Sequence, residues 1–324
     1  MTRSLRRNGW TLGLVGVFLL LLVFTKAIQP DFGISGLESL ARAALPFALA
    51  TAAMSIVVIA GGIDLSVAAV MAVASVSAAR LMAGWDGGSP VTVVLFVILL
   101  GAVMGAINGL LIVLSRVPDI VVTLAMLFVW EGTALLILNA PGGTVYPALR
   151  DIILGSLTLP FLPPALTAFI PNALVVLLLV IALIWLPLRR SRLGLSIYAI
   201  GSDQTAAFRS GVATGPVRVA AYAVAGVLAA LGGLSVAMST GVGEPIPGPY
   251  LMLSVAAVVL GGVALTGGKG GLFGPIVAVF ILRLVRLDLT LLSVDPNVTT
   301  IVEGTIMAVV VMAGGLVALR ESRR

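Results

Sequence analysis

The stretch Val57-Val58-Ile59-Ala60-Gly61-Gly62-Ile63-Asp64-Leu65-Ser66 decides the fold class, because it separates two apolar runs at 43–60 and 65–84. Each run approaches the roughly 20 apolar residues that a helix needs to cross the hydrocarbon core of a bilayer. Two successive glycines remove side chains where the first helix would continue, so the backbone there can break or approach a neighbour closely. The pattern predicts two membrane helices joined by a break.

The rest of the chain repeats this pattern of long apolar runs and short polar breaks. Its composition is 60% hydrophobic and only 10% charged, whereas a soluble domain has about 25% charged residues. We therefore expect an all-α polytopic membrane bundle of eight to ten transmembrane helices, ten being favoured, in a single transmembrane domain, 1–324. The other apolar segments are 10–25, 91–114, 120–138, 172–188, 219–239, 251–266, 272–287 and 298–319. The first is interpreted as a retained helix, since no small-x-small cleavage pattern follows it closely, and the alternative is a cleaved signal peptide.

The basic residues predict the orientation of the bundle. Most of the 19 lysines and arginines fall in one set of alternating loops, with a cluster at Arg189, Arg190 and Arg192. Short loops rich in Lys and Arg stay in the cytoplasm. Both termini and residues 189–218 are therefore expected inside, and the proline-rich residues 139–171 outside. The net charge of +6 is explained by this topology rather than by nucleic acid.

The sequence excludes several chemistries. It contains no cysteine and no histidine, which excludes thiol nucleophiles, Cys/His zinc sites and a Ser-His-Asp triad. In the glycine-rich loop 267–271, Lys269 is followed by Gly270, so the loop does not match the phosphate-binding motif G-x-x-x-x-G-K-[ST]. We expect no catalytic residues, no metal and no cofactor. ATP hydrolysis, if used, must come from a partner, and a membrane-embedded enzyme is the least favoured class.

The candidate pathway and hinge residues are Gly61, Gly62, Asp64, Ser66 and Asn108. Asp64 and Ser66 can cap the helix that follows, or the break can serve as a conformational joint beside the pathway. Asn108 lies on a small-residue segment in which Gly101 and Gly105 allow close helix packing.

Glu131 stands within an apolar segment. It is expected to pair with a buried cation or a polar backbone group, and the alternative is a proton-relay role.

Residues 202–210 are predicted to form a short cytoplasmic helix. Ser202 is the expected N-cap, Asp203 suits the positive end of the helix dipole, and Gly211 is the expected stop. Ala206, Ala207 and Phe208 give this helix a small apolar face suited to docking. The alternative is an ordinary basic loop held near anionic lipid.

Four stretches resemble the permeases of bacterial ATP-binding-cassette monosaccharide importers, the ribose/xylose/galactose/arabinose group. They are Gly61–Ser66, then Asn108-Gly109 with Val122-Thr123-Leu124 and Gly132, then Arg192 through Gly201 to Gly211, and last Ala256–Gly262 running into Gly267–Gly271. The resemblance implies the larger, roughly ten-helix class of importer permease in the bacterial inner membrane. It also implies a second permease subunit, identical or paired, two cytoplasmic ATPase subunits that dock on the helix carrying Gly201, Asp203, Ala206, Ala207 and Gly211, and a periplasmic or lipid-anchored solute-binding protein.

The chain departs from the family pattern at two places. Glu131 stands where the family commonly has a basic residue, and Leu251-Met252-Leu253 stand where it commonly has acidic residues.

The favoured function is the permease subunit of an ATP-driven importer for a small polar solute. A monosaccharide is favoured over a nucleoside or a branched-chain amino acid. The rival is a self-sufficient secondary carrier that uses Asp64 and Glu131 for proton coupling.

Overall fold

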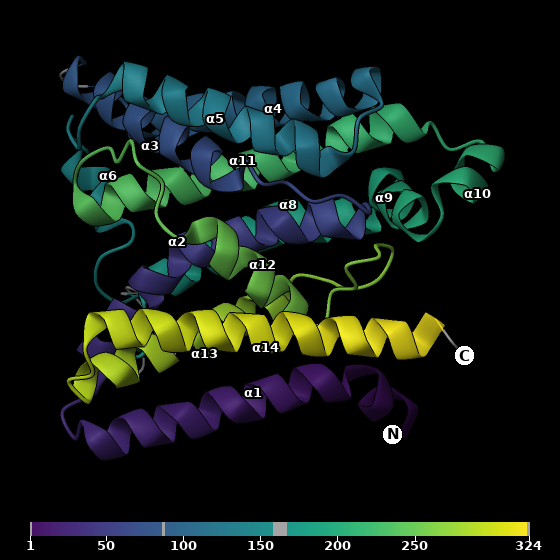
Figure 1. The fold of residues 1–324 in the computed structure, drawn as a ribbon. Coiled ribbons are helices and arrows are strands. Elements are labelled where there is room, and N and C mark those ends of the chain that lie inside the picture. The colour runs from purple at the N-terminus through teal and green to yellow at the C-terminus, as the bar shows by residue number, and fades with distance from the viewer. Residues whose placement is uncertain (1, 86–87, 158–166, 323–324) are drawn as a thin grey trace.

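The computed structural model describes residues 2–85, 88–157 and 167–322, and within them the regular elements are helices (Figure 1). They are α1 (Thr2–Ile28), α2 (Ile34–Ile59), α3 (Val67–Ala83), α4 (Pro90–Ser115), α5 (Asp119–Ile137), α6 (Pro147–Asp151), α8 (Asn172–Arg190), α9 (Arg192–Ser202), α10 (Gln204–Arg209), α11 (Thr214–Thr240), α12 (Tyr250–Leu260), α13 (Phe273–Leu291) and α14 (Pro296–Ser322). Each predicted apolar segment corresponds to one of these helices, which confirms a polytopic helical bundle. By length and composition, α1 from Gly9, α2, α4, α5, α8 and α11 can each cross a membrane.

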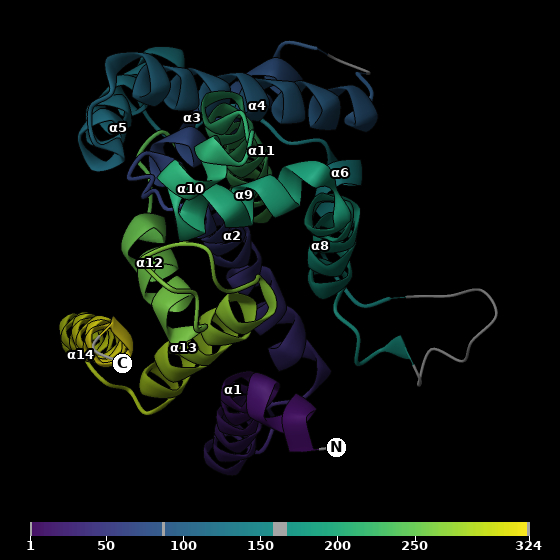
Figure 2. The same ribbon diagram turned by 90° about the vertical axis from the view of Figure 1, so that its right-hand side faces the viewer.

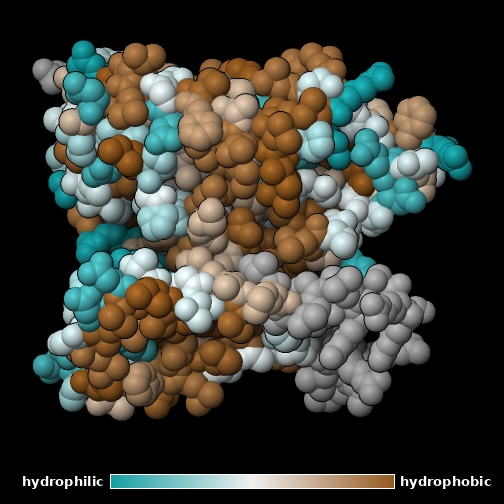
Figure 3. Space-filling model, viewed as in Figure 1, coloured by the Kyte–Doolittle hydropathy of each residue, from teal (hydrophilic) through white to brown (hydrophobic). Residues whose placement is uncertain are grey.

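The bundle is built around α2. Its second half, from Ala44 to Ile59, is buried along its whole length, because small and apolar residues cover every side of the helix and leave no polar face for solvent. Helices α11, α12, α13 and α8 pack around it. Outer helices such as α1, α5 and α8 expose apolar side chains, and Figure 3 shows apolar residues across the middle of the molecule with hydrophilic residues toward both ends. This distribution fits a lipid-facing surface.

Helices α4 and α11 pack closely through glycines on both helices. A Cβ at Gly101 would collide with the carbonyl oxygen of Gly226, and one at Gly105 with that of Tyr222. The Gly101-x-x-x-Gly105 pair predicted from the sequence therefore lets the two backbones touch. This contact fixes Asn108, one turn further along α4, against the centre of the bundle, where its side chain is fully buried.

The start of α1, the end of α14 and the α9–α10 segment lie at one end of the molecule, and α6 lies at the other (Figure 1). Figure 2, which looks onto the first of these ends, shows α9 and α10 crossing in front of α2 and α11. The prediction for the eighth apolar segment was too long at its end. Helix α12 stops at Leu260, because Gly262 turns the chain with a φ of +81°, a backbone conformation that favours glycine.

Candidate functional site

Three segments far apart in the sequence meet at the α9–α10 end mainly through the backbone of glycines. We call this contact the glycine junction; it consists of Gly61, Gly201, Gly267 and Gly268. The Gly268 N–H donates a hydrogen bond of 2.9 Å to the carbonyl of Ile59. A Cβ at Gly201 would lie 2.7 Å from the Gly268 nitrogen and would collide with the Ile59 oxygen. The end of α2, helix α9 and the α12–α13 loop are therefore held together with no room for side chains.

Helix α9 is also tied to the α12–α13 loop by a side chain. The Tyr198 hydroxyl donates to the carbonyl of Gly270 over 2.7 Å. Burial raises the pKa of Tyr198 above its ordinary value, so the hydroxyl remains a donor at neutral pH. The predicted residues Gly61 and Gly201 are thus brought together in one structural unit, and the loop 267–271 completes it.

The short helix predicted at 202–210 is present as α10, with a different start. Ser202 is the last residue of α9, and its hydroxyl donates to the carbonyl of Tyr198. The N-cap is Asp203, whose carboxylate accepts from the Ala206 N–H at 2.9 Å, so the prediction of Ser202 as the cap was wrong. Gly211, with a φ of +85°, ends the helix as predicted. There the N–H groups of Gly211 and Val212 donate to the carbonyls of Phe208 and Ala207, which is the Schellman arrangement.

The apolar face of α10 is divided between the protein interior and the surface. Ala207 is only 6% exposed and belongs to the protein's own core. Ala206 is exposed, and Phe208 is 68% exposed. The expectation that Ala206 and Ala207 together form an outward face is therefore corrected: Ala207 anchors α10 to the bundle, while Ala206 and Phe208 point away from it. Phe208 is thus a large apolar side chain exposed on α10, the helix at the tip of the molecule in Figure 1.

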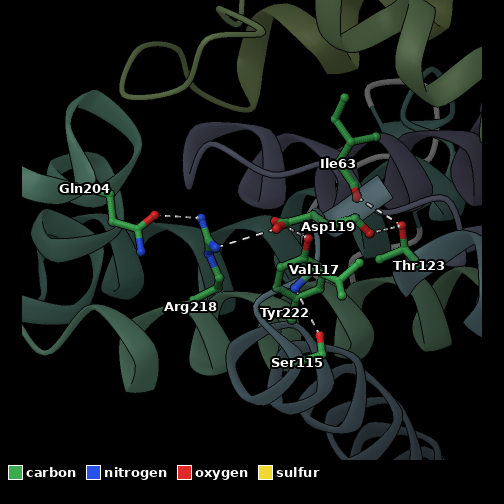
Figure 4. A network of polar contacts seen from close by, with 8 residues as sticks. All are labelled: Ile63, Ser115, Val117, Asp119, Thr123, Gln204, Arg218 and Tyr222. Carbon is green, nitrogen blue, oxygen red and sulfur yellow. Dashed lines mark hydrogen bonds and ion pairs between the residues drawn. The ribbon is translucent and has the colours of Figure 1, made fainter. Parts of the chain in front are cut away.

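A polar cluster connects α10 to the membrane helices (Figure 4). We call it the Asp119 cluster; it consists of Asp119, Arg218, Tyr222 and Gln204. Asp119 begins α5 and lies 3.5 Å from the Arg218 guanidinium of α11. It also accepts a 2.9 Å hydrogen bond from the Tyr222 hydroxyl. The other guanidinium nitrogen of Arg218 donates to Gln204 of α10 over 3.3 Å.

The Asp119 cluster explains Gly62. A Cβ at that position would lie 2.8 Å from the Tyr222 hydroxyl and would collide with the Asp119 carboxylate. Asp119 was not identified from the sequence as a site residue, and Arg218 was used only as one of the basic residues that predict the orientation of the bundle. The available signal was a carboxylate and a guanidinium at the starts of two apolar helices on the same side of the membrane, a common setting for an ion pair.

A second hydrogen-bonded chain holds the α2–α3 break. The Asp64 carboxylate accepts from the N–H and the hydroxyl of Ser66, at 2.8 and 2.6 Å. The Ser66 hydroxyl also accepts from the Asn108 amide at 2.7 Å, and Asn108 in turn accepts from the Trp130 indole at 3.1 Å. The structure thus places the predicted residues Asp64, Ser66 and Asn108 in one buried chain. Asp64 orients Ser66, which is the N-cap residue of α3 but makes no side-chain cap bond itself.

Thr123 of α5 is part of the same joint, although it was noted only in the family resemblance. Its hydroxyl oxygen accepts from the Leu65 N–H at 3.1 Å and lies 3.2 Å from the Ile63 carbonyl. Helix α5 therefore contacts the backbone of the break on both sides of Asp64. These contacts join α5 directly to the α2–α3 connection.

Glu131 is not in either network. Its side chain is half-buried on α5, and within the described ranges it has no ion-pair or hydrogen-bond partner, in contrast to its expected pairing. Ion pairs form instead between Arg218 and Asp119 and between Arg286 and Glu303.

Comparison with known proteins identifies the family. The model of a family described as "Branched-chain amino acid transport system / permease component" matches residues 36–311. The chain belongs to this family. The Autoinducer 2 import system permease protein LsrD of Escherichia coli K12 is 27% identical over 323 residues, covering 94% of this chain and 92% of the relative. The LsrD protein of Shigella flexneri matches to the same extent. No solved structure matches.

Family membership and the apolar helices together make this chain a multi-pass inner-membrane permease of the ATP-binding-cassette importer class. The matched residues include both networks and the whole glycine junction. The site described above is therefore part of a transport permease.

Proposed function

We propose that the chain is the permease subunit of an ATP-driven, binding-protein-dependent importer, and that its solute is a monosaccharide. The proposal includes ten crossings, made by the long helices together with α3, α12, α13 and α14, in one transmembrane domain, 1–324. Both termini and residues 189–218 are cytoplasmic, and residues 139–171 are periplasmic. Support comes from the common location of the start of α1, the end of α14 and α9–α10, combined with the arginines at 189, 190 and 192.

The observation that carries the proposal is the position of α10. It protrudes at the cytoplasmic end with Phe208 exposed, and it is connected inward through Gln204 to the Asp119 cluster. An ATPase partner that moves α10 would pull on α5 and α11 through that cluster. Because Thr123 of α5 is hydrogen-bonded to the α2–α3 break, the movement would reach Asp64 at the centre of the bundle. The glycine junction provides a second connection, from α9 to the end of α2.

The partners in this proposal are a second permease subunit, identical or paired, a cytoplasmic ATPase, a periplasmic or lipid-anchored solute-binding protein, and membrane lipid. A monosaccharide is favoured by the sugar-permease resemblance of the four motifs, and the similar LsrD proteins belong to an autoinducer 2 import system. A nucleoside or a branched-chain amino acid is the alternative, and the family description names the latter.

Uptake by membrane vesicles tests the proposal. Vesicles that contain this chain, its ATPase and its binding protein should accumulate labelled D-ribose or D-galactose only when ATP is supplied, and vesicles without the ATPase should not. A proton gradient alone should give no uptake. Accumulation driven by the gradient without ATPase would establish the secondary carrier instead, and ATP-driven uptake of L-leucine but of neither sugar would reassign the solute.

A further inference from the structure

A pocket of about 260 Å³ lies between α3, the end of α11 and residues 241–249, at the end of the molecule opposite α9–α10. The space is large enough for several water molecules and suits a solute of one sugar ring. Its polar lining residues are Ser75, Thr240, Glu244 and Tyr250, and apolar residues such as Met71 and Pro247 complete it. A few polar groups among apolar walls are typical of small-molecule sites.

Glu244 is the charged residue of this lining. Its backbone N–H donates to the Ser75 hydroxyl at 3.1 Å, which fixes residue 244 against α3. Its carboxylate has no hydrogen-bond or ion-pair partner anywhere in residues 2–85, 88–157 and 167–322. A carboxylate accepts several hydrogen bonds and donates none, so it suits a solute that carries several hydroxyl donors.

Tyr250 supplies a fixed aromatic wall. Its ring packs on the Phe47 ring with centroids 4.6 Å apart, and the Arg283 guanidinium lies 4.7 Å from the Phe47 centroid. Gly248 leaves room for the Tyr250 ring, because a Cβ there would lie 2.9 Å from it. The ring is therefore held in place before any solute arrives, and an aromatic ring in the lining suits the C–H groups of a sugar ring.

The loop that carries Glu244 is tied to the outer part of the chain. Gly243 and Gly142 exchange two backbone hydrogen bonds, at 2.7 and 3.1 Å. Residues 241–249 therefore connect the proposed periplasmic segment 139–171 with the start of α12. A solute released by a binding protein at this end would meet the pocket before the centre of the bundle.

We infer that this pocket is an outward-side subsite for a neutral polyhydroxylated solute, with Glu244 as its hydroxyl acceptor and Tyr250 as its stacking wall. The inference rests on the proposed importer function and deepens it by naming a recognition site. The carboxylate disfavours solutes whose reachable group is anionic. It thus separates a sugar from a solute that presents a free carboxylate.

The absence of cysteine from the chain permits a direct test. Thr240→Cys places one thiol at an exposed position of the pocket lining, and Ser89→Cys places one at an exposed position before α4 as a matched control. Full-length protein in right-side-out vesicles is treated with a membrane-impermeant maleimide, with and without millimolar D-ribose, D-galactose or L-leucine. At a sugar concentration of twice Kd, occupancy should slow alkylation of the pocket thiol about threefold, the factor 1 + [L]/Kd.

The control thiol should react at one rate in all conditions. Adding Glu244→Gln to the Thr240→Cys protein should abolish protection by the sugar, measured as the ratio of the alkylation rates without and with sugar in that same double variant. Equal alkylation with and without either sugar, or undiminished protection in the Glu244→Gln protein, would overturn the inference. Protection by L-leucine alone would also overturn it. Since labelling needs neither ATP nor ATPase, these outcomes are independent of the uptake experiment: ATP-driven sugar uptake without protection refutes the subsite but leaves the importer function standing.

Discussion

Gly201→Ala is expected to separate α9 from the end of α2. The new Cβ would collide with the Ile59 carbonyl oxygen and would lie 2.7 Å from the Gly268 nitrogen. Those two atoms belong to backbone in separate segments and are joined by a 2.9 Å hydrogen bond. No flexible side chain can move aside to admit the methyl group, so the segments themselves must separate.

The size of the effect follows from two terms. Forcing a methyl group into a packed contact costs about 1–3 kcal/mol, and losing the Gly268–Ile59 hydrogen bond costs about 0.5–1.5 kcal/mol. Against these, alanine favours a helix over glycine by about 0.5–1 kcal/mol. Gly132→Ala is the matched control, because Gly132 is also helical and has open space around its Cβ position. The helix gain is common to both variants, so Gly201→Ala should be about 1.5–4.5 kcal/mol less stable than Gly132→Ala.

Denaturant unfolding of the detergent-solubilised chain measures this difference, and ATP-driven uptake by vesicles measures its consequence. Gly201→Ala should still insert in the membrane, because the junction lies at the end of the helices, but its uptake should be lost. The Gly132→Ala variant should transport normally. Equal unfolding midpoints together with equal uptake for the two variants would show that the glycine junction does not carry the coupling assigned to it.

Three further predictions concern the two polar networks and α10. Asp64→Asn should retain most uptake while Asp64→Ala loses it, because Asn keeps an oxygen that can accept from Ser66 and no cation pairs with Asp64 among the described residues. If Asp64→Asn were inactive in the vesicle assay, the charge of Asp64 would have a role of its own. Asp119→Ala should cost about 1.5–3 kcal/mol of unfolding free energy and reduce uptake. Adding Arg218→Ala to that variant should cause little further loss of unfolding free energy. Fully additive losses would show that the two residues do not act as a pair. Phe208→Ala should leave the thermal stability of the chain unchanged but reduce co-purification of the ATPase. Ala207→Glu, at a position only 6% exposed, should instead lower the stability of the chain before any partner is added. Normal ATPase binding by the Phe208→Ala variant would exclude this face of α10 as the docking contact.

The sequence by itself determined the class of the protein and most of its helices. A composition this apolar cannot fold as a soluble domain, and runs of nearly 20 apolar residues have one stable form in lipid, since the helix satisfies every backbone polar group within the segment. Local signals also sufficed for Gly211, whose positive φ ends α10, and for the close-packing pair Gly101 and Gly105. Local signals did not decide where α10 begins, because Ser202 and Asp203 are both good N-cap residues and only the packing of α9 selects between them.

Only the tertiary structure decided which residues meet. Residues Gly61, Gly201 and Gly268 lie far apart in the sequence, and nothing in their local sequence states that their backbones touch. The pairing of Asp119 with Arg218 depends on α5 and α11 starting at the same end, and the inward position of Ala207 depends on the direction from which α10 approaches the core. Local propensity acts over a few residues, whereas these contacts arise from the packing of helices that are distant along the chain.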